Sequence, residues 1–314
     1  MVPGATIATS EDGDSASTDP NEKTSHMRDL NFELKQLCHR NRDGSFATQA
    51  ARERVLDLAA RQLHEAGFRH MSASSLKPKH VHTLLSRWKT EEQSTGTIKN
   101  RMAVLRWWAE KIAKPNVIAR DNDAYDIAHR QYVTNVSKAW SLGDSQLLRL
   151  SDPYTAMSLR LQAAFGLRRE ESIKIQLAWA DRGHVLALKD SWTKGGRPRE
   201  VPVRTAEQRQ LLQEARSLAG QGALIPAHKS YVEQLRRFEH QCAAAGIRRV
   251  HGLRHQYAQN RYRELTGWSA PAAGGPRSRE LTTAQRETDH AARLQLSAEL
   301  GHEREQVVAV YLGR

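Results

Sequence analysis

The sequence predicts a mainly α-helical protein with a small antiparallel β-sheet, organised as two domains. Apolar residues recur at helical spacing through most of the chain. Two short strand-like runs, residues 184–188 and 200–203, flank a turn that contains Gly195 and Gly196, which favours a hairpin. The length of 314 residues is enough for two separate hydrophobic cores.

Changes in composition suggest where the domains begin and end. Residues 1–25 are rich in Ser, Thr, Asp, Gly and Ala with almost no large apolar side chain, so we expect a disordered acidic arm. A helical domain is expected over residues 26–135. The helical pattern loosens before residue 142, and we place an interdomain linker within 128–143. The second domain is expected over residues 142–314.

The charge of the chain predicts a polyanionic partner. Its 48 Lys and Arg residues outnumber its 35 Asp and Glu residues, which gives a net charge of +13. Residues 1–25 have a net charge of −4, so the rest of the chain has a net charge of +17. Such an excess is typical of proteins that bind a polyanion. Charge alone does not separate DNA from RNA or from an anionic membrane surface.

Other features of composition favour a cytoplasmic protein. No run approaches eighteen apolar residues, and the N-terminus lacks a basic segment followed by an apolar one. Cys38 and Cys242 are the only cysteines, and they have neither metal-ligand spacing nor a disulfide framework. Neither a membrane span nor secretion is therefore expected.

The most informative helix of the first half is expected over residues 97–113. Earlier helices are expected over 27–37 and 48–66 and from Pro78 onward. In the 97–113 helix one narrow arc is apolar, and it comprises Ile98, Met102, Leu105, Ala109 and Ile112. Another side carries polar and basic residues together with a tryptophan: Lys99, Asn100, Arg106, Trp107, Lys111 and Lys114. The first arc is expected to pack and the second to face outward.

The second half is expected to hold further helices around the hairpin. They are placed from Pro153 to Gly166 and near residues 205–219, 229–245, 250–264 and 281–299. A helix is expected to end at Gly301, with another beginning near His302. The segment Trp268–Arg277 is rich in Ala, Gly and Pro. We expect it to be a mobile loop outside any core, and we hypothesise that it contacts neighbouring subunits.

Five short motifs follow one another in the second half. Arg168 lies in a turn between two helices, and Lys194 lies at the tip of the hairpin. His251 and Arg254 share one face near the positive end of a helix, which predicts an anion site. The segment Leu300-Gly301-His302 comes next, and Tyr311 follows nine residues after the histidine. Each motif alone is common.

Taken in this order, the motifs resemble those of the tyrosine recombinases, the phage-type integrases. The motif likeness covers roughly residues 142–314, and the chain from about residue 26 onward is similar to integrases of integrative mobile elements. The resemblance implies a two-domain clamp around DNA, with a helical core-binding domain and a catalytic domain. It also implies an enzyme that cuts and rejoins recombination sites in double-stranded DNA as a homo-oligomer, expected to be a tetramer, with a possible directionality factor. Neither a metal nor another cofactor is implied.

The resemblance also assigns roles to individual residues. Arg168 and Arg254 would hold the non-bridging phosphate oxygens, for which forked guanidinium donors are well suited. Lys194 would protonate the departing 5′ oxygen, His251 would handle the tyrosine proton, and His302 would donate to the phosphate. Tyr311 would attack and leave a 3′-phosphotyrosyl link. The choice of Arg168 over Arg169, and of Lys194 over Arg197, is based on spacing.

Further residues are assigned supporting or binding roles. Glu171, three residues after Arg168 on the same helix face, is expected to buttress the site. In the first domain the resemblance makes Lys99, Asn100 and Arg106 the candidates for phosphate or base contact.

Four alternatives compete with integration and excision of a mobile element. A metal-dependent nuclease could use His251, His255 and His302 as ligands, but we expect no acid pair in the site, and the arginines expected there would repel a divalent ion. A type IB topoisomerase would share the phosphotyrosyl chemistry. A chromosome-dimer resolvase would share the recombination chemistry. A catalytically silent DNA-binding regulator would keep the fold alone.

Overall fold

The computed structural model describes residues 20–302 and 304–314 and separates into two compact units, divided between Arg130 and Gln131. The described residues are mainly helical, with one antiparallel pair of strands, which confirms the predicted fold class. No described helix has the length and apolar character needed to cross a lipid bilayer. Residues 1–19 of the predicted acidic arm lie outside the described residues, and a helix begins at Pro20, before the predicted domain start.

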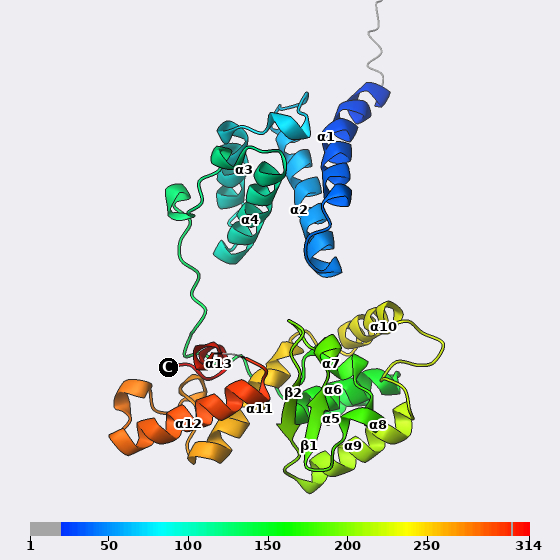
Figure 1. Cartoon of the computed structure of the whole chain (residues 1–314), viewed down its shortest axis with the longest axis vertical. Helices are drawn as coiled ribbons and strands as arrows, with labels where there is room; N and C mark the ends of the chain where they lie inside the picture. The colour runs from blue at the N-terminus through cyan, green and yellow to red at the C-terminus, as the bar shows by residue number, and fades with distance from the viewer. Residues whose placement is uncertain (1–19, 303) are drawn as a thin grey trace, which may run out of the picture. The chain divides into compact units, whose positions relative to one another are not determined.

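The described part of unit 1 contains four α-helices, and α1 and α2 lie side by side (Figure 1). The α-helices are α1 (Pro20–Arg40), α2 (Phe46–Glu65), α3 (Pro78–Thr90) and α4 (Thr95–Lys111); short 3-10 helices span Ala73–Ser75, Pro115–Val117 and Asp123–Tyr125. Ser45 and Ser94 accept hydrogen bonds from backbone N–H groups in the first turns of α2 and α4, so their hydroxyls fix where these helices begin.

The core of unit 1 is built around Trp88 and Trp108, both of which are fully buried. Each indole N–H has a partner: Trp88 donates to the Gln62 side chain at 2.8 Å, and Trp108 donates to the Ala73 carbonyl at 2.8 Å. The apolar arc predicted for α4 is buried except for Ile112, which is half-buried. The helical periodicity of the sequence thus identified the packed side of α4 correctly.

Unit 2 contains a two-stranded sheet within a helical frame. Strands β1 (Val185–Leu188) and β2 (Arg199–Pro202) pair antiparallel, with Val185 opposite Pro202 and Leu188 opposite Arg199. The α-helices are α5 (Asp144–Leu147), α6 (Pro153–Phe165), α7 (Arg169–Lys174), α8 (Leu177–Ala180), α9 (Ala206–Ala219), α10 (Tyr231–Ala244), α11 (His251–Thr266), α12 (Thr283–Glu299) and α13 (Glu305–Leu312); 3-10 helices span Asp190–Trp192, Pro271–Ala273 and Ser278–Glu280.

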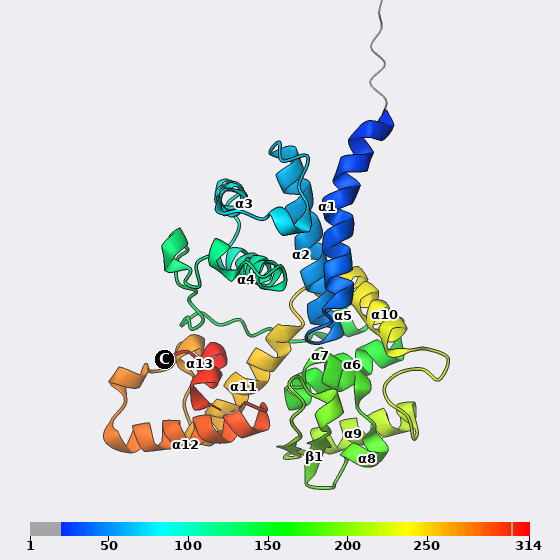
Figure 2. The same cartoon turned by 45° about the horizontal axis from the view of Figure 1, so that its top comes forward.

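Helix α11 is central to unit 2. It packs against α6 on one side and against α12 and α13 on the other (Figure 2). The main core collects buried apolar side chains from α6, both strands, α9, α11, α12 and α13. A smaller core joins α10 to Leu159, Ile173 and Leu253. Residues that are far apart in sequence but belong to α11, α12 and α13 therefore meet in one place.

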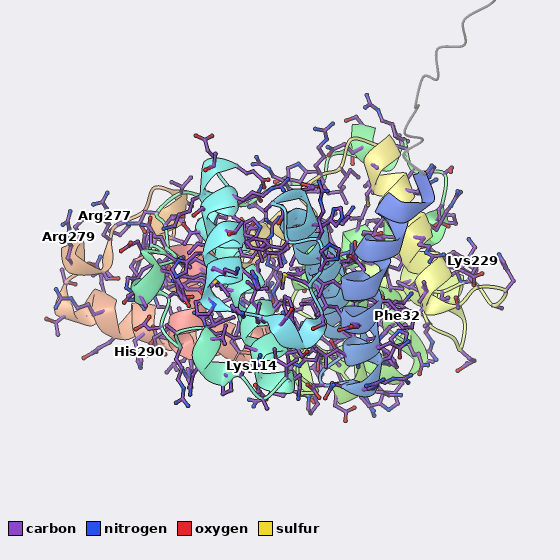
Figure 3. The ribbon with its side chains drawn as sticks, turned by 90° about the horizontal axis from the view of Figure 1, so that it is seen from above. Phe32, Lys114, Lys229, Arg277, Arg279 and His290 are labelled. Atoms are coloured by element: carbon purple, nitrogen blue, oxygen red, sulfur yellow. The ribbon has the colours of Figure 1, made fainter. Side chains whose placement is uncertain are left out.

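The expectation that Trp268–Arg277 is a loop outside any core is wrong for its first part. Ala270 is fully buried in the main core, and Pro271 and Ala272 are also buried. Small side chains allow this close approach, since a Cβ atom on Gly275 would overlap the Ser269 carbonyl. The outer part is exposed, with Arg277 and Arg279 projecting from the surface (Figure 3).

Candidate active site

A turn between α6 and α7 positions Arg168. Gly166 ends α6 in the left-handed region, with φ of 61°. A side chain could not replace its hydrogen, because a Cβ atom there would lie 2.5 Å from the Tyr257 ring. The chain therefore turns tightly enough to leave Arg168 directly before α7.

Glu171 connects Arg168 to the rest of the site. Its carboxylate accepts hydrogen bonds from the backbone N–H of Arg168 at 2.6 Å and from the Arg168 guanidinium at 2.7 Å. It also accepts two bonds of 2.7 Å from Arg199. Burial alone would raise the pKa of the Glu171 carboxyl, but hydrogen bonds from Arg199 and the charges of Arg199, Arg168 and Arg254 lower it to about 2. Glu171 is therefore a buried carboxylate that contacts two arginines.

Arg254, on the first turn of α11, is only 1% exposed. Its Nη1 donates to the Gly166 carbonyl at 2.5 Å, its Nη2 donates to the Leu300 carbonyl, and its Nε donates to the Tyr311 hydroxyl at 3.2 Å. Burial lowers the pKa of Arg254 to about 10, which still leaves it charged at neutral pH. One guanidinium thus joins the turn before α7, the turn after α12 and the tyrosine of α13.

A glycine turn after α12 positions His302. Gly301 has φ of 66°, the His302 N–H donates to Ser297 O at 2.8 Å, and the Gly301 N–H donates to Ala298 O at 3.0 Å. These bonds form a Schellman turn. The next helix, α13, begins only at Glu305, so the prediction that it begins near His302 is wrong by three residues. His302 lies in the connection and not at a helix N-terminus.

His302 is held in its neutral form. Burial and the charges of Arg254, Arg168 and Arg199 lower the pKa of His302 to about 4. Its Nε2 is buried and has no hydrogen-bond partner among the described residues. A polar atom in this condition is available for a ligand that the protein alone does not supply.

Three histidine rings surround the Tyr311 ring. The ring-centroid distances to Tyr311 are 4.7 Å from His255, 5.8 Å from His302 and 6.0 Å from His251. Tyr311 is 5% exposed, and Gln259 of α11 donates to its backbone carbonyl at 3.0 Å. No group of three or more His, Cys, Asp or Glu side chains within the described residues is arranged to hold a metal ion.

His251 and Lys194 complete the predicted set. Burial lowers the pKa of His251, and the charges of Arg254, Arg168 and Lys194 lower it further, so the ring is neutral at neutral pH. Lys194 is exposed in the turn between the strands and has no hydrogen-bond or ion-pair partner within the described part of the chain. Its electrostatic effect on His251 indicates that the hairpin brings it to the same side of unit 2.

An open pocket of about 430 Å³ lies between β2 and the turn after α12, and it is lined by Arg197, Pro198, Arg199, Glu200, Ala298, Gly301 and His302. Taken together, the hydrogen bonds and ring contacts described above form one cluster that comprises Arg168, Glu171, His251, Arg254, His302 and Tyr311. Lys194 lies at its edge.

Sequence analysis missed Arg199 and considered His255 only as a ligand in the nuclease alternative. Arg199 is buried on β2, and His255 is buried against Tyr311. Alternation along β2 contained a signal for the first, because Arg199 and the buried Val201 are two residues apart and share a face. His255 follows His251 by four residues and therefore lies on the same side of α11.

Several side chains on the polar and basic side of α4 that was predicted to face outward are engaged by other segments of unit 1. Arg106 donates to the Ala119 carbonyl and the Asn122 side chain, both at 2.9 Å, and Trp107 donates to Asp43 at 2.8 Å. Lys111 pairs with Asp43 at 3.1 Å. These side chains are engaged because the connection between α1 and α2 and the segment after α4 both pack on this side of the helix.

Lys99 and Asn100 differ from the rest of that face. Their side chains have no hydrogen-bond or ion-pair partner in the part of unit 1 that the structure describes, and Asn100 is exposed. Arg106, the third predicted DNA contact, instead holds the segment after α4, and burial lowers its pKa. Only the first turns of α4 therefore offer unengaged polar side chains from the predicted set.

Comparison with known proteins agrees with the observed fold. The family model for the N-terminal domain of phage integrases matches residues 27–115, and an integrase family model matches residues 129–260. No curated protein matches the sequence.

Several solved structures are similar to the chain. A lambda integrase tetramer bound to a Holliday junction has a TM-score of 0.58 at 14% identity, covering 95% of this chain and 82% of that one. The XerH site-specific recombinase bound to a palindromic difH substrate has a TM-score of 0.55 at 16% identity, covering 96% and 87%. The Tn1549 transposon integrase bound to circular intermediate DNA has a TM-score of 0.51 at 15% identity, covering 89% and 93%.

The two family models together span most of both units, and the arginines, histidines and tyrosine predicted from the motif order meet in one cluster in unit 2. This chain belongs to the tyrosine recombinases, the family of site-specific recombinases that includes the phage integrases.

Proposed function

We propose that this recombinase cuts and rejoins specific sites in double-stranded DNA through a 3′-phosphotyrosyl intermediate, and that it integrates and excises a mobile element in the cytoplasm. The observation that carries the proposal is the hydrogen bond from Arg254 Nε to the Tyr311 hydroxyl. A nucleophile and a cation suited to a phosphate oxygen are thereby held within one hydrogen bond of each other.

The chemical step needs a proton acceptor beside Tyr311. In our proposal the Tyr311 oxygen bonds to phosphorus, the bond from phosphorus to the 5′ oxygen breaks, and the tyrosine proton passes to His251. The lowered pKa of His251 supports this role, because a neutral imidazole can accept a proton and an imidazolium cannot. Lys194 gives its proton to the departing 5′ oxygen, and rejoining reverses each transfer.

The remaining groups stabilise the charge that builds up on phosphate. Arg168 and Arg254 hold the non-bridging oxygens, and His302 donates a further hydrogen bond. The buried Nε2 of His302 supports its assignment, since it has no partner among the described residues and is available for a bound group. For His302 to donate from Nε2, its single proton must lie on that nitrogen in the neutral ring.

We propose DNA recombination sites and further copies of this chain as partners. The lambda integrase structure is described as a tetramer on a Holliday junction, which supports a tetramer here. The Tn1549 enzyme is described as a transposon integrase bound to circular intermediate DNA, which supports the mobile-element role. In unit 1 we retain Lys99 and Asn100 as DNA contacts and assign Arg106 to holding the segment after α4. We also propose a directionality factor as an additional partner.

Covalent trapping tests the proposal. In a duplex nicked a few nucleotides to the 3′ side of the scissile phosphate, cleavage releases the short fragment that carries the new 5′ hydroxyl. Rejoining is then prevented, so the protein stays attached to the 3′ phosphate. Wild-type protein should form this adduct in the presence of a chelator and without ATP, and peptide mapping should place the link on Tyr311. Tyr311→Phe removes only the attacking oxygen, so it should retain DNA binding and form no adduct. Loss of the wild-type adduct on chelation, or an adduct with Tyr311→Phe, would overturn the mechanism.

A further inference from the structure

Arg199 is a buried cation to which the proposed chemistry assigns no part. It begins strand β2 and is 8% exposed. Its Nη1 and Nη2 donate to the two carboxylate oxygens of Glu171, each at 2.7 Å, in a bidentate pair. Its Nε donates to the Glu299 carbonyl at 3.0 Å. All three guanidinium nitrogens of Arg199 are therefore engaged by the protein itself.

The bonds to Glu171 link Arg199 to Arg168. Glu171 Oε1 accepts from both Arg199 and Arg168, and Glu171 Oε2 accepts from Arg199 and from the Arg168 backbone. A carboxylate that is fully buried cannot turn to water if one partner is lost. The direction in which Glu171 holds the Arg168 guanidinium is thus set partly by Arg199.

The opposite side of Arg199 contacts the turn that carries His302. A Cβ atom added to Gly301 would lie 2.8 Å from Arg199 Cδ, so the arginine stem fills the space that the glycine leaves open. The next carbonyl along this turn, Leu300 O, accepts from Arg254 and, at 3.5 Å, from Arg168. Arg199 therefore supports the turn from both its carbonyl side and its glycine.

The position of Arg199 in the hairpin adds a third link. Arg199 pairs with Leu188 at the end of the sheet nearest the turn, five residues after Lys194. The return strand of the hairpin is therefore anchored, through one side chain, to α7 and to the end of α12. The three segments that carry Arg168, Lys194 and His302 therefore meet at the Arg199 side chain.

We propose that Arg199 is a positioning residue that fixes Arg168, the Lys194 hairpin and His302 relative to one another in the cleavage-competent site. This inference rests on the proposed phosphotyrosyl function. Arg199 acts through Glu171 and the Gly301 turn and touches no reacting atom. Misplacing catalytic groups by about an ångström can cost on the order of 100-fold in rate.

The central test compares Arg199→Met with Arg216→Met. Both variants remove one positive charge, but Arg216 is exposed near the end of α9 and makes no hydrogen bond or ion pair with the described residues of this network. We expect Arg199→Met to bind its site within about threefold of wild type and to form the covalent adduct roughly 100-fold more slowly. Arg216→Met should form it at the wild-type rate. Arg199→Lys should recover little, because one ammonium cannot make a bidentate pair and also reach Glu299.

A substrate with a methylphosphonate at the scissile position distinguishes positioning from general loss of folding. Its neutral linkage needs less charge stabilisation, so a defect that acts through Arg168 should shrink. We expect the loss in Arg199→Met to fall to about tenfold on this substrate, and that in Arg168→Ala to fall in parallel. An equal loss on both linkages would overturn the positioning role.

The pH dependence of adduct formation provides an independent measurement. Three arginines act on the Glu171 carboxylate: Arg168 in the turn before α7, Arg199 on β2 and Arg254 on α11. Without Arg199 its carboxyl should take up a proton at higher pH, so the rate in Arg199→Met should begin to fall at a higher pH than in wild type. Adding Glu171→Gln to Arg199→Met removes that carboxyl and should remove this shift. A shift that persists in the double variant would exclude Glu171 as the link.

The outcomes separate this inference from the proposed function. If wild-type protein forms no phosphotyrosyl adduct, both proposals fail together. If wild type and Arg216→Met react and Arg199→Met reacts equally fast, only the role of Arg199 fails. Should Arg199→Met not fold, Glu171→Gln keeps the side-chain shape, and a rate within threefold of wild type would then overturn the inference.

Discussion

Arg254 and Lys194 are both proposed to act on the same phosphodiester, yet the protein treats them in opposite ways. Arg254 is 1% exposed, and each of its three guanidinium nitrogens donates to a group of the protein. Lys194 is exposed in a hairpin turn and has no hydrogen-bond or ion-pair partner in the described residues. One cation is part of the fold, and the other is carried at its surface.

The difference matches what each step requires. A group that stabilises charge on a phosphate is most effective when it is fixed before the substrate arrives, since no reorganisation is then needed. A proton donor must reach an oxygen that leaves, and a hairpin tip with Gly195 and Gly196 at positive φ can adjust to it. The contrast predicts that alanine variants of Arg254 and Lys194 will differ in stability as well as in rate.

The largest effect is expected for Arg254→Ala. It should slow adduct formation by at least about 1,000-fold, on the scale of losing a principal charge-stabilising donor. It should also lower the free energy of unfolding by about 1–3 kcal/mol, because the Gly166 and Leu300 carbonyls lose a buried donor. Urea unfolding and single-turnover trapping measure the two effects. Wild-type stability in Arg254→Ala would show that the guanidinium does not hold these turns together.

Lys194→Ala should show a loss of rate without a loss of stability. We expect adduct formation to slow by about 100-fold or more, as for removal of a general acid, and the free energy of unfolding to stay within about 0.5 kcal/mol. A 5′-thio leaving group needs little protonation, so it should restore most of the rate. It should not restore Arg254→Ala. Equal rescue of both variants would contradict the assignment of Lys194 as the proton donor and Arg254 as the group that stabilises charge on the phosphate.

Burial of His302 also predicts that the stability of the protein depends on pH. The pKa of His302 in the folded protein is about 4, below the ordinary value of 6.5, mainly because of burial and then because of nearby arginines. The unfolded chain therefore binds a proton that the folded site does not, and stability should fall as pH drops from about 6.5 towards 4. His302→Gln should reduce this dependence, measured as Tm against pH. A pH dependence that is unchanged in His302→Gln would contradict this origin.

The sequence was sufficient to predict most of the residues that meet in this cluster, including the support Glu171, but not the support Arg199. Arg168, His251, Arg254, His302 and Tyr311 could be singled out because a family resemblance fixes their order along the chain. Arg199 could not, since a single Arg in a four-residue strand gives no indication of which carboxylate it will meet. Its partner Glu171 is 28 residues away, and only tertiary packing brings them together.

The errors in prediction have a common physical origin. The helical pattern correctly identified the packed side of α4, but it could not show that other segments would also cover part of the polar side. Trp107 and Lys111 are engaged by Asp43, which lies more than 60 residues earlier in the chain. Likewise, the Ala- and Gly-rich segment after Trp268 resembles a surface loop in composition, and its small side chains are what allow Ala270 to enter the core.

The smallest expected effect sharpens the same contrast within unit 1, where Arg106 is held by the protein and Lys99 is not. Lys99→Ala should weaken DNA binding and lower the slope of log affinity against log salt by about one, because one phosphate contact is lost. Its free energy of unfolding should stay within about 0.5 kcal/mol of wild type.

Arg106→Ala should behave in the opposite way. Its guanidinium donates to Ala119 and Asn122, so its loss should lower stability by about 1 kcal/mol and leave the salt slope unchanged. Measuring binding at several salt concentrations, beside urea unfolding, separates the two variants. A lower salt slope in Arg106→Ala would mean that this side chain leaves its partners to meet DNA, and an unchanged slope in Lys99→Ala would move the DNA-binding surface away from the start of α4.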